Sequence, residues 1–323
     1  MASTTSSRVN PKYKKKYRVG NWPAYERGLR ARGDVTIWFT DEAFRSWTPP
    51  SSGCRGGQRR YSNLAILTTL TLRMLFHLPL RQTEGFVGSV LRLMDVELRA
   101  PDHTTISRRN RDVVVPALCR DDNGPVHLIV DSTGLKVYGA GEWCARKHRK
   151  AHERRGWRKL HLGVDDNGDI VAEALTGHTV DDADMVPELL DQVEAPVRRF
   201  TGDGAYDTRG VYDAVDEAGG TDVEVVVPPR RSATTSPKGT GPWTQRIQHI
   251  ERIADIGRQA WQKETGYRQQ ARVEGTFLRY KRIFGGRLRA KRCEAQQREA
   301  MVGCTVLNKM FALGKAQSYA VTA

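Results

Sequence analysis

Three acidic residues stand where the sequence could perform chemistry. Asp131 ends an apolar run that begins at Val126. Asp203 comes just after the apolar segment Val197–Thr201, and Glu274 lies in a strongly basic stretch. Carboxylate oxygens without imidazole or thiolate are the ligands that suit Mg²⁺ or Mn²⁺. Two such ions about 3.5–4 Å apart can stabilise the attacking and leaving oxygens of an in-line phosphoryl transfer. A second interpretation stays open, because an Asp after a strand is often only a turn or cap residue.

The elements around these acids alternate between strands and helices. After Pro116 we predict strands at 126–130, 157–164, 169–175, 197–201 and 223–227. Helices are predicted at 184–193, 208–218, 259–281 and 294–313. This order predicts an α/β fold, a mixed five-stranded sheet with helices on both faces.

In such a sheet the three acids can meet. Asp131 and Asp203 would lie side by side on neighbouring strands, because functional crevices form off strand ends. Gly202 and Gly204 allow a close backbone approach at this point. A helix packed across the strand ends would deliver Glu274.

The segment before Pro116 is typical of a small helical domain. Helices are predicted at 63–76 and 81–94, and a third begins after Pro101-Asp102. The third helix continues into Arg108 and Arg109, and this succession has the outline of a helix-turn-helix. Small helical bundles produce the same pattern, so both interpretations stand from sequence alone.

The charge indicates a polyanionic partner. The 323 residues include 52 Lys and Arg against 37 Asp and Glu, a net charge of +15, and the pI is about 9.8. Nucleic acid is the first choice and an anionic membrane surface the second, with a merely basic protein as the plainest alternative. Basic clusters occur in the N-terminal arm, at 146–159 and at 268–292, whereas the segment 165–224 is acidic. Basic surfaces around a carboxylate site favour DNA.

Several classes are disfavoured by composition. A hydrophobic fraction of 39% is enough for a core, which argues against wholesale disorder. The longest apolar stretch, Leu64–Phe76, is too short to span a bilayer and contains Arg73. Five scattered cysteines without a CxxC argue against a disulfide framework or a zinc site. The first twenty residues have no apolar segment typical of a secretion signal, so we expect a cytoplasmic protein.

The segments that carry the three acids form a recognisable set. They are Asp131-Ser-Thr-Gly-Leu-Lys-Val-Tyr, Gly202-Asp203-Gly-Ala-Tyr-Asp207 and Arg272-Val-Glu274-Gly-Thr-Phe-Leu-Arg-Tyr-Lys281. Together they closely resemble the catalytic blocks of bacterial insertion-sequence transposases with an Asp-Asp-Glu (DDE) triad, and the insertion-sequence-5 family fits best. The segments 101–109 and 157–165 fit as well, and the resemblance covers about residues 20 to 313.

This resemblance implies a fold, an activity and partners. The core would be ribonuclease H-like, with Asp131, Asp203 and Glu274 holding two Mg²⁺ ions, for which Mn²⁺ substitutes. The enzyme would bind terminal inverted repeats of a transposable element and cleave strands at the element's ends. The released 3′-hydroxyl would then join target DNA. Double-stranded DNA and at least a second copy of this chain are the implied partners, without a membrane, in the cytoplasm at the bacterial nucleoid.

The family also has a Tyr…Arg…Glu…Lys signature around its glutamate. Tyr267, Glu274 and Lys281 fall in register, but the expected arginine position holds Gln270. Lys281 follows Glu274 by nearly two helical turns, so the two share a face. The residues expected to contact DNA are Tyr267, Arg268, Arg272, Lys281, Arg108, Arg109, Lys14, Lys15 and Lys16. We expect His161 and His178 to be structural or close to DNA.

The sequence therefore predicts four parts. A basic flexible arm spans 1–20, and a helical, helix-turn-helix-like DNA-binding domain spans 21–116. The DDE catalytic domain spans 117–313, with an insertion at about 228–258, and a tail spans 314–323. Two alternative functions stay open: a metal-dependent nuclease of the same fold without strand transfer, and a catalytically silent DNA-binding regulator.

Overall fold

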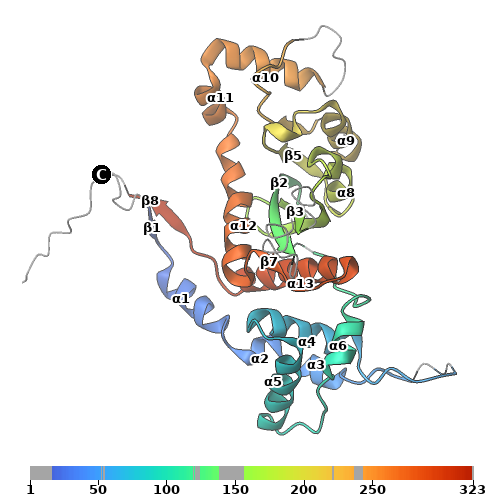
Figure 1. Cartoon of the computed structure of the whole chain (residues 1–323). Helices are drawn as coiled ribbons and strands as arrows, with labels where there is room; N and C mark the ends of the chain where they lie inside the picture. The colour runs from blue at the N-terminus through green and yellow to red at the C-terminus, as the bar shows by residue number, and fades with distance from the viewer. Residues whose placement is uncertain are drawn as a thin grey trace, which may run out of the picture. The chain divides into compact units, whose positions relative to one another are not determined.

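A computed structural model describes residues 17–51, 53, 55–118, 120, 124–137, 156–219, 222–235 and 243–321. The chain divides into two compact units. The smaller unit combines Met1–Trp38 with Lys309–Ala323, and the larger unit is Phe39–Asn308. Figure 1 shows the elements of both.

The larger unit is built on a mixed sheet with the strand order β4-β3-β2-β5-β6. Its strands are β2 (Val126–Val137), β3 (Trp157–Val164), β4 (Ile170–Gly177), β5 (Val197–Thr201) and β6 (Glu224–Val226). β2, β3 and β4 form an antiparallel meander. β5 pairs in parallel with β2, and β6 pairs in parallel with β5. The predicted mixed α/β arrangement is confirmed.

Two features of this sheet differ from the prediction. The first strand does not end at Val130 but continues to Val137, so Asp131 lies in the middle of β2. A short sixth strand, β7 (Arg287–Leu288), pairs in parallel with Lys136 and Val137 at the far end of β2. The prediction stopped early because residues 131–134 are polar and only half-buried, so the apolar signal ends before the strand does.

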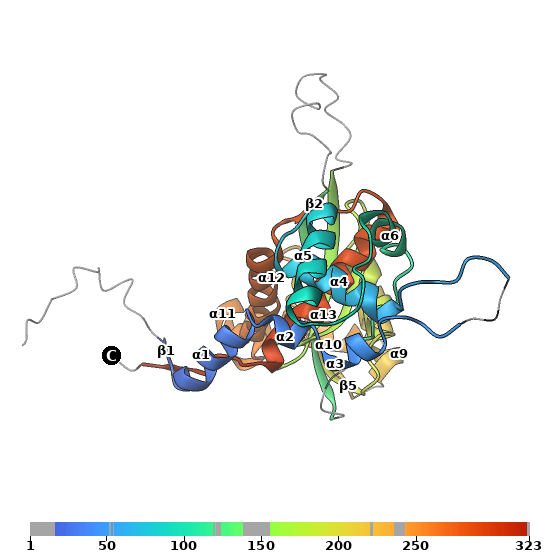
Figure 2. The same cartoon turned by 90° about the horizontal axis from the view of Figure 1, so that it is seen from below.

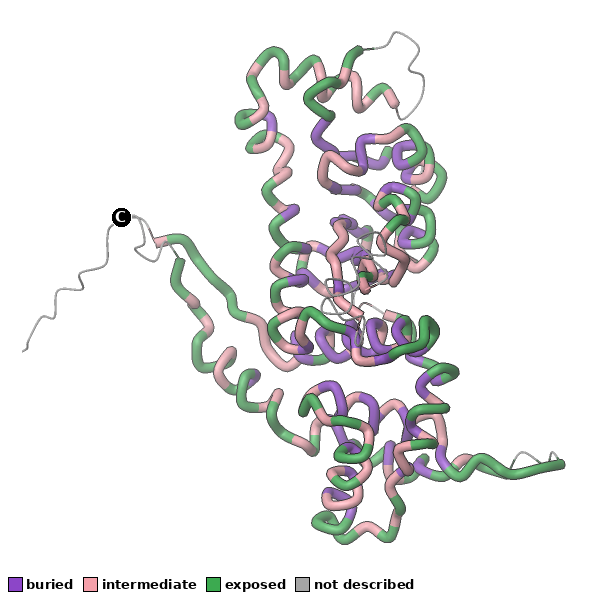
Figure 3. The backbone as a smooth tube through the Cα atoms, in the orientation of Figure 1, coloured by how far each residue is buried: buried purple, intermediate pink, exposed green. Residues whose placement is uncertain are grey.

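Helices cover both faces of the sheet. On one face, α8 (Val186–Leu190) and α9 (Arg209–Gly219) join β2, β4, β5 and β6 in a single apolar cluster. On the other face, α12 (Ala271–Phe284) packs against β2 and β3, as Figure 1 shows. The long α13 (Cys293–Ala312) is tied to β4, because the Asn308 side chain bonds the N–H and the carbonyl of Ile170. The purple segments of Figure 3 follow these strands and their covering helices.

The helix predicted at 259–281 is interrupted. The structure has α11 (Arg258–Glu264), a 3-10 turn η4 (Tyr267–Gln270), and then α12. Gly266 adopts a φ of +63° at the break, a left-handed conformation that glycine accepts without strain. The predicted insertion at about 228–258 contains a helix, α10 (Trp243–Ile256), none of whose residues is buried. The predicted helix at 184–193 is shorter, with a 3-10 turn η2 (Ala183–Met185) leading into α8.

The rest of the larger unit is a helical bundle, seen in front in Figure 2. It contains α3 (Asp41–Arg45), α4 (Asn63–Leu75), α5 (Leu80–Leu93) and α6 (His103–Arg109). The Ser62 hydroxyl accepts the Ala65 N–H at 3.0 Å, and Asp102 caps α6 in the same way. Both caps satisfy backbone donors that a helix start leaves free. The predicted helix starts are confirmed, whereas a helix-turn-helix role for α5 and α6 stays a prediction.

Among the described residues, no single helix is long and apolar enough to cross a membrane. The pair α4 and α5, bent by 110° at its break, passes the same test by length and composition only.

The smaller unit joins the two ends of the described chain. β1 (Tyr17–Val19) pairs antiparallel with β8 (Ser318–Ala320), next to α1 (Trp22–Ala31) and α2 (Val35–Trp38). The Arg32 guanidinium donates to the carbonyls of Met310 and Gly314, at 3.2 and 2.6 Å. The predicted arm and tail thus pair over three residues each, which local pattern could not reveal because nearly 300 residues separate them. Lys14, Lys15 and Lys16 lie outside the described residues.

Candidate active site

Asp131 and Asp203 are brought together by the parallel register of β2 and β5. Ile129 on β2 pairs with Thr201, the last residue of β5. Each acid lies two residues beyond this pair, in the same chain direction. The two carboxylates therefore emerge next to each other, as the sequence predicted for neighbouring strands.

The three acids influence one another electrostatically. The pKa of the Asp131 carboxyl is raised to about 6, chiefly by burial and further by the carboxylates of Asp203, Glu274 and Asp182. The hydrogen bond that Asp131 accepts from the Ser132 N–H, at 2.7 Å, acts in the opposite direction. A carboxyl that is desolvated and faces other acids is harder to ionise. A neighbouring cation would therefore stabilise the charged form of Asp131.

The turn that carries Asp203 requires a glycine before it. The Asp203 carboxylate accepts the Ala205 N–H at 2.8 Å and caps the 3-10 turn η3 (Gly204–Tyr206). A Cβ added at Gly202 would lie 2.8 Å from the Tyr206 ring, closer than real contacts allow. The expected close approach is confirmed at Gly202. At Gly204 an added Cβ would make only an ordinary contact of 3.5 Å.

α12 places a cation over the strand face that bears Asp131. The Lys281 ammonium donates to the Thr133 hydroxyl at 2.6 Å. Thr133 lies two residues beyond Asp131 on β2, and side chains two apart on a strand share a face. Glu274 lies on α12 seven residues before Lys281 and is exposed to solvent.

The 3-10 turn η4 supplies a further neighbour of the acids, Tyr267. The pKa of the Tyr267 hydroxyl is raised to about 12, first by burial and then by Asp203, Glu274 and Asp131. This aromatic side chain therefore lies near the three acids and stays protonated.

Gln270, at the position where the family pattern has arginine, was missed as a functional residue. Its side chain is only 4% exposed, and its amide donates to the Val130 carbonyl at 2.9 Å. Gln270 thus holds the backbone of β2 immediately before Asp131. The departure from the family signature was the one sequence signal that pointed to this position.

The histidines near the strands have structural environments. His161 pairs with Ser132 across β2 and β3, so its side chain points to the face opposite Asp131. It is completely buried, and its Nε2 lies 2.7 Å from the Thr176 hydroxyl. Burial lowers its pKa to about 4, although Asp182 acts in the opposite direction. His161 is therefore a neutral core side chain at physiological pH, and His178 follows β4, partly exposed.

The structure separates the remaining basic residues predicted to bind DNA. Arg268 and Arg272 are exposed on η4 and α12, and Arg108 is exposed on α6. The Arg109 guanidinium instead donates to the Tyr61 carbonyl at 3.0 Å, so Arg109 stabilises the bundle. The charged residues of the second basic cluster up to Arg155 lie outside the described residues.

The donor chemistry of the triad fits a hard divalent cation. All three side chains supply carboxylate oxygens, and the raised pKa of Asp131 reflects burial first and then repulsion from the other acids, both of which a cation would offset. In the described part of the chain, however, no three His, Cys, Asp or Glu side chains lie close enough together to hold a metal ion. Asp203 is turned into its Ala205 bond, and Glu274 extends into solvent.

Two protein-family models match this chain, and both are described as a transposase DDE domain. One matches residues 30–140 and the other residues 122–309. The second spans more than half of the 323 residues and contains the main sheet and all three acids. Such enzymes act on DNA and generally use divalent metal ions, and the mixed sheet with its helices is consistent with their ribonuclease H-like α/β fold. The chain therefore belongs to the DDE transposases of insertion-sequence type.

Proposed function

We propose that this chain is the transposase of its own insertion sequence and acts at both steps of transposition. It binds the terminal inverted repeats, cleaves a DNA strand at the element's ends, and joins the 3′-hydroxyl to target DNA. The observation that supports this most is the register that sets Asp131 beside Asp203, within the residues matched by a transposase DDE model. The three sequence blocks around the acids favour the insertion-sequence-5 family.

Asp131, Asp203 and Glu274 are the proposed catalytic residues and metal ligands, with Mg²⁺ as the natural ion and Mn²⁺ as a substitute. Bound there, divalent cations would polarise the scissile phosphate and lower the pKa of the attacking hydroxyl. The all-carboxylate donor set and the raised pKa of Asp131 support this assignment. Glu274, exposed on α12, is the acid with most freedom to turn inward.

The neighbouring side chains would position the DNA strand. Lys281 would hold a phosphate oxygen near the triad, exchanging its bond with Thr133 for a charge-assisted one. Tyr267, which stays protonated beside the acids, would donate a hydrogen bond to the same strand. Arg268 and Arg272, both exposed, would follow the phosphate backbone.

The helical bundle and the N-terminal arm would recognise the element's ends. Arg108 is exposed on α6, whose first turn is fixed by Asp102. Lys14, Lys15 and Lys16 would add contacts to the phosphate backbone. Two ends must be held together for transposition, so we also propose that at least a dimer acts on DNA.

A strand-transfer assay tests this function. The purified chain is incubated with a labelled duplex carrying one end of its element, a supercoiled target plasmid and Mg²⁺. We expect the labelled strand to become joined to the plasmid through its 3′-end, and expect no product in chelator. A nuclease without strand transfer would cut the labelled duplex and never join it. A DNA-binding regulator would retain the duplex and leave it intact.

A further inference from the structure

A strongly basic groove lies between α6 and the segment that leads from β7 into α13. Its volume is about 440 Å³, and it is lined by six cationic side chains and no acidic one. The six, here called the groove cations, are Arg73, Arg108, Arg111, Arg289, Lys291 and Arg292. They come from three places in the sequence, and only the fold assembles them.

The groove cations are not held in direct ion pairs among the described residues, although Glu299 lies near Arg73 and Arg289. Within the described ranges, none of the six makes an ion pair with Asp or Glu at 4.0 Å or less. Arg108 and Arg111 form only long bonds of 3.4 Å, to the Thr105 hydroxyl and the Arg108 carbonyl. Lys291 and Arg292 are exposed. Six like charges in one concave surface concentrate the positive potential that attracts a polyanion.

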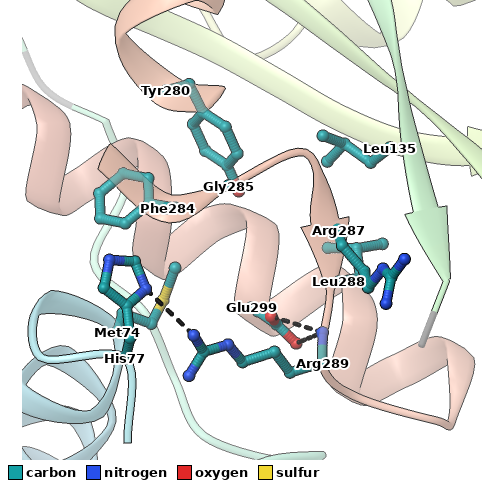
Figure 4. Close-up of a pocket in the computed structure, with 10 residues that line it drawn as sticks. All are labelled: Met74, His77, Leu135, Tyr280, Phe284, Gly285, Arg287, Leu288, Arg289 and Glu299. Carbon is teal, nitrogen blue, oxygen red and sulfur yellow. Dashed lines mark hydrogen bonds between the residues drawn. The ribbon is translucent and has the colours of Figure 1, made fainter. Parts of the chain in front are cut away.

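The wall of the groove is built to hold Arg289 in place. Figure 4, a close-up of a neighbouring pocket that shares Arg289 with the groove, shows the Glu299 carboxylate beside the Arg289 backbone nitrogen and the guanidinium turned toward His77. Glu299 accepts the N–H groups of Arg289 and Ala290, at 2.8 and 2.7 Å. The Arg289 guanidinium lies 3.0 Å from the His77 Nδ1. Glu299 thus fixes the backbone at Arg289 and Ala290 and is not itself among the residues that line the groove.

Arg73 is the most buried of the groove cations and has an unsatisfied donor. It is 8% exposed, and its Nε is buried without a hydrogen-bond partner among the described residues. Burial and the neighbouring Arg289 lower its pKa, whereas Glu299 acts in the opposite direction. A buried guanidinium with a free donor is costly unless an anion reaches it. This buried arginine therefore favours an anionic ligand in the groove that it lines.

We propose that this groove binds the phosphate backbone of the DNA duplex whose end lies at the carboxylates. The proposal rests on the proposed transposase function and adds a second, non-catalytic contact to it. Contacts from Arg and Lys to phosphates position a duplex without reading its sequence. The groove begins beside Leu288, which pairs with Val137, six residues beyond Asp131 and so about 20 Å along β2. A duplex whose axis runs parallel to β2 would place a phosphate about six base pairs from the scissile bond in the groove.

Single-charge variants test the groove. Lys291→Ala and Arg292→Ala are compared with the control Arg209→Ala. Arg209 is exposed on α9, where it pairs with Asp213, and α9 packs on the face of the sheet opposite α12. Binding of an element-end duplex is measured between 50 and 200 mM salt. The logarithm of the binding constant falls with the logarithm of the salt concentration, and in each groove variant this slope should be about 0.9 less negative. Binding should be about eightfold weaker at 0.1 M salt. The control should match the wild type.

The outcomes separate the groove from the proposed function. If both groove variants keep the wild-type affinity and salt slope while the wild type cleaves its ends, the groove assignment is wrong and the transposase function stands. If the wild type does not bind the duplex at all, both fail. Binding of an acidic peptide in place of DNA, with unchanged DNA affinity, would also overturn the proposal.

A neutral linkage in the DNA locates the contact. Methylphosphonates, which remove one phosphate charge, are placed singly along the duplex. A methylphosphonate about six base pairs from the scissile bond should weaken DNA binding by the wild type. The same methylphosphonate should not further weaken DNA binding by Lys291→Ala or Arg292→Ala. Equal losses in the wild type and both variants at every position would contradict the groove contact.

Discussion

The Lys281 ammonium donates to the Thr133 hydroxyl at 2.6 Å, and Thr133 lies on the same face of β2 as Asp131. This bond fixes α12 over the strand that carries the first acid. Because Lys281 and Glu274 are nearly two turns apart on α12, the same contact also sets the side of the helix on which Glu274 lies. The contact thereby sets the positions of both Lys281 and Glu274 relative to the sheet.

Lys281 should act through its charge rather than through Thr133. Lys281→Met removes a charge-assisted contact to phosphate of about 1.5–3 kcal/mol, so end cleavage should slow about tenfold to a hundredfold. Thr133→Val removes only the resting bond and should change the rate by less than about threefold. Single-turnover cleavage measures both. Equal losses of cleavage rate in the two variants would show that the bond between Lys281 and Thr133, and not a phosphate contact, supports cleavage.

Gly202 should be essential although it carries no functional group. A methyl group at this position would collide with the Tyr206 ring and displace the turn that holds Asp203. We expect Gly202→Ala to lose cleavage strongly and about 1–3 kcal/mol of unfolding free energy. Gly204→Ala, where the added Cβ makes an ordinary contact, is the matched control. Urea unfolding and cleavage are measured on both, and wild-type cleavage by Gly202→Ala would contradict the account.

The sequence predicts much of this site because its signals are local. The apolar runs located β3, β4 and β5 closely, and the position of each acid after an apolar run predicted that Asp131 and Asp203 would lie side by side on neighbouring strands. The helix break at Gly266 was missed, since apolar spacing continues across it. The pairing of β1 with β8 and the assembly of Arg73, Arg111 and Lys291 in one groove depend on contacts across long chain separations, which no local pattern encodes.

The stability of the cation-free protein should fall as Asp131 ionises. Its pKa is about 6 in the folded state against 3.8 for an ordinary Asp. The folded state therefore binds the proton more tightly, so this contribution is present below pH 4 and is lost as pH rises through 6. The loss is at most about 3 kcal/mol at 1.36 kcal/mol per pKa unit, and less with solvent screening.

Urea unfolding in chelator, at pH 4 and pH 7.5, measures this loss directly. Asp131→Asn cannot ionise, so its stability relative to the wild type should rise between these two pH values. Adding Mg²⁺ at pH 7.5 should stabilise the wild type more than the variant, because a cation offsets the charge. A constant difference between the two proteins at both pH values would show that the Asp131 carboxyl ionises normally.

The central claim is that three carboxylates perform the chemistry and are not needed to hold DNA. The most direct measurement is Mg²⁺-dependent cleavage of an element-end duplex by Asp131→Asn, Asp203→Asn and Glu274→Gln, with duplex binding followed in parallel. Each substitution keeps the side-chain shape and removes one negative charge. The account predicts that all three variants bind the duplex at least as tightly as the wild type and that none cleaves it. Cleavage at the wild-type rate by any one of them would contradict the assignment of that acid, and cleavage by all three would refute the DDE site in this chain.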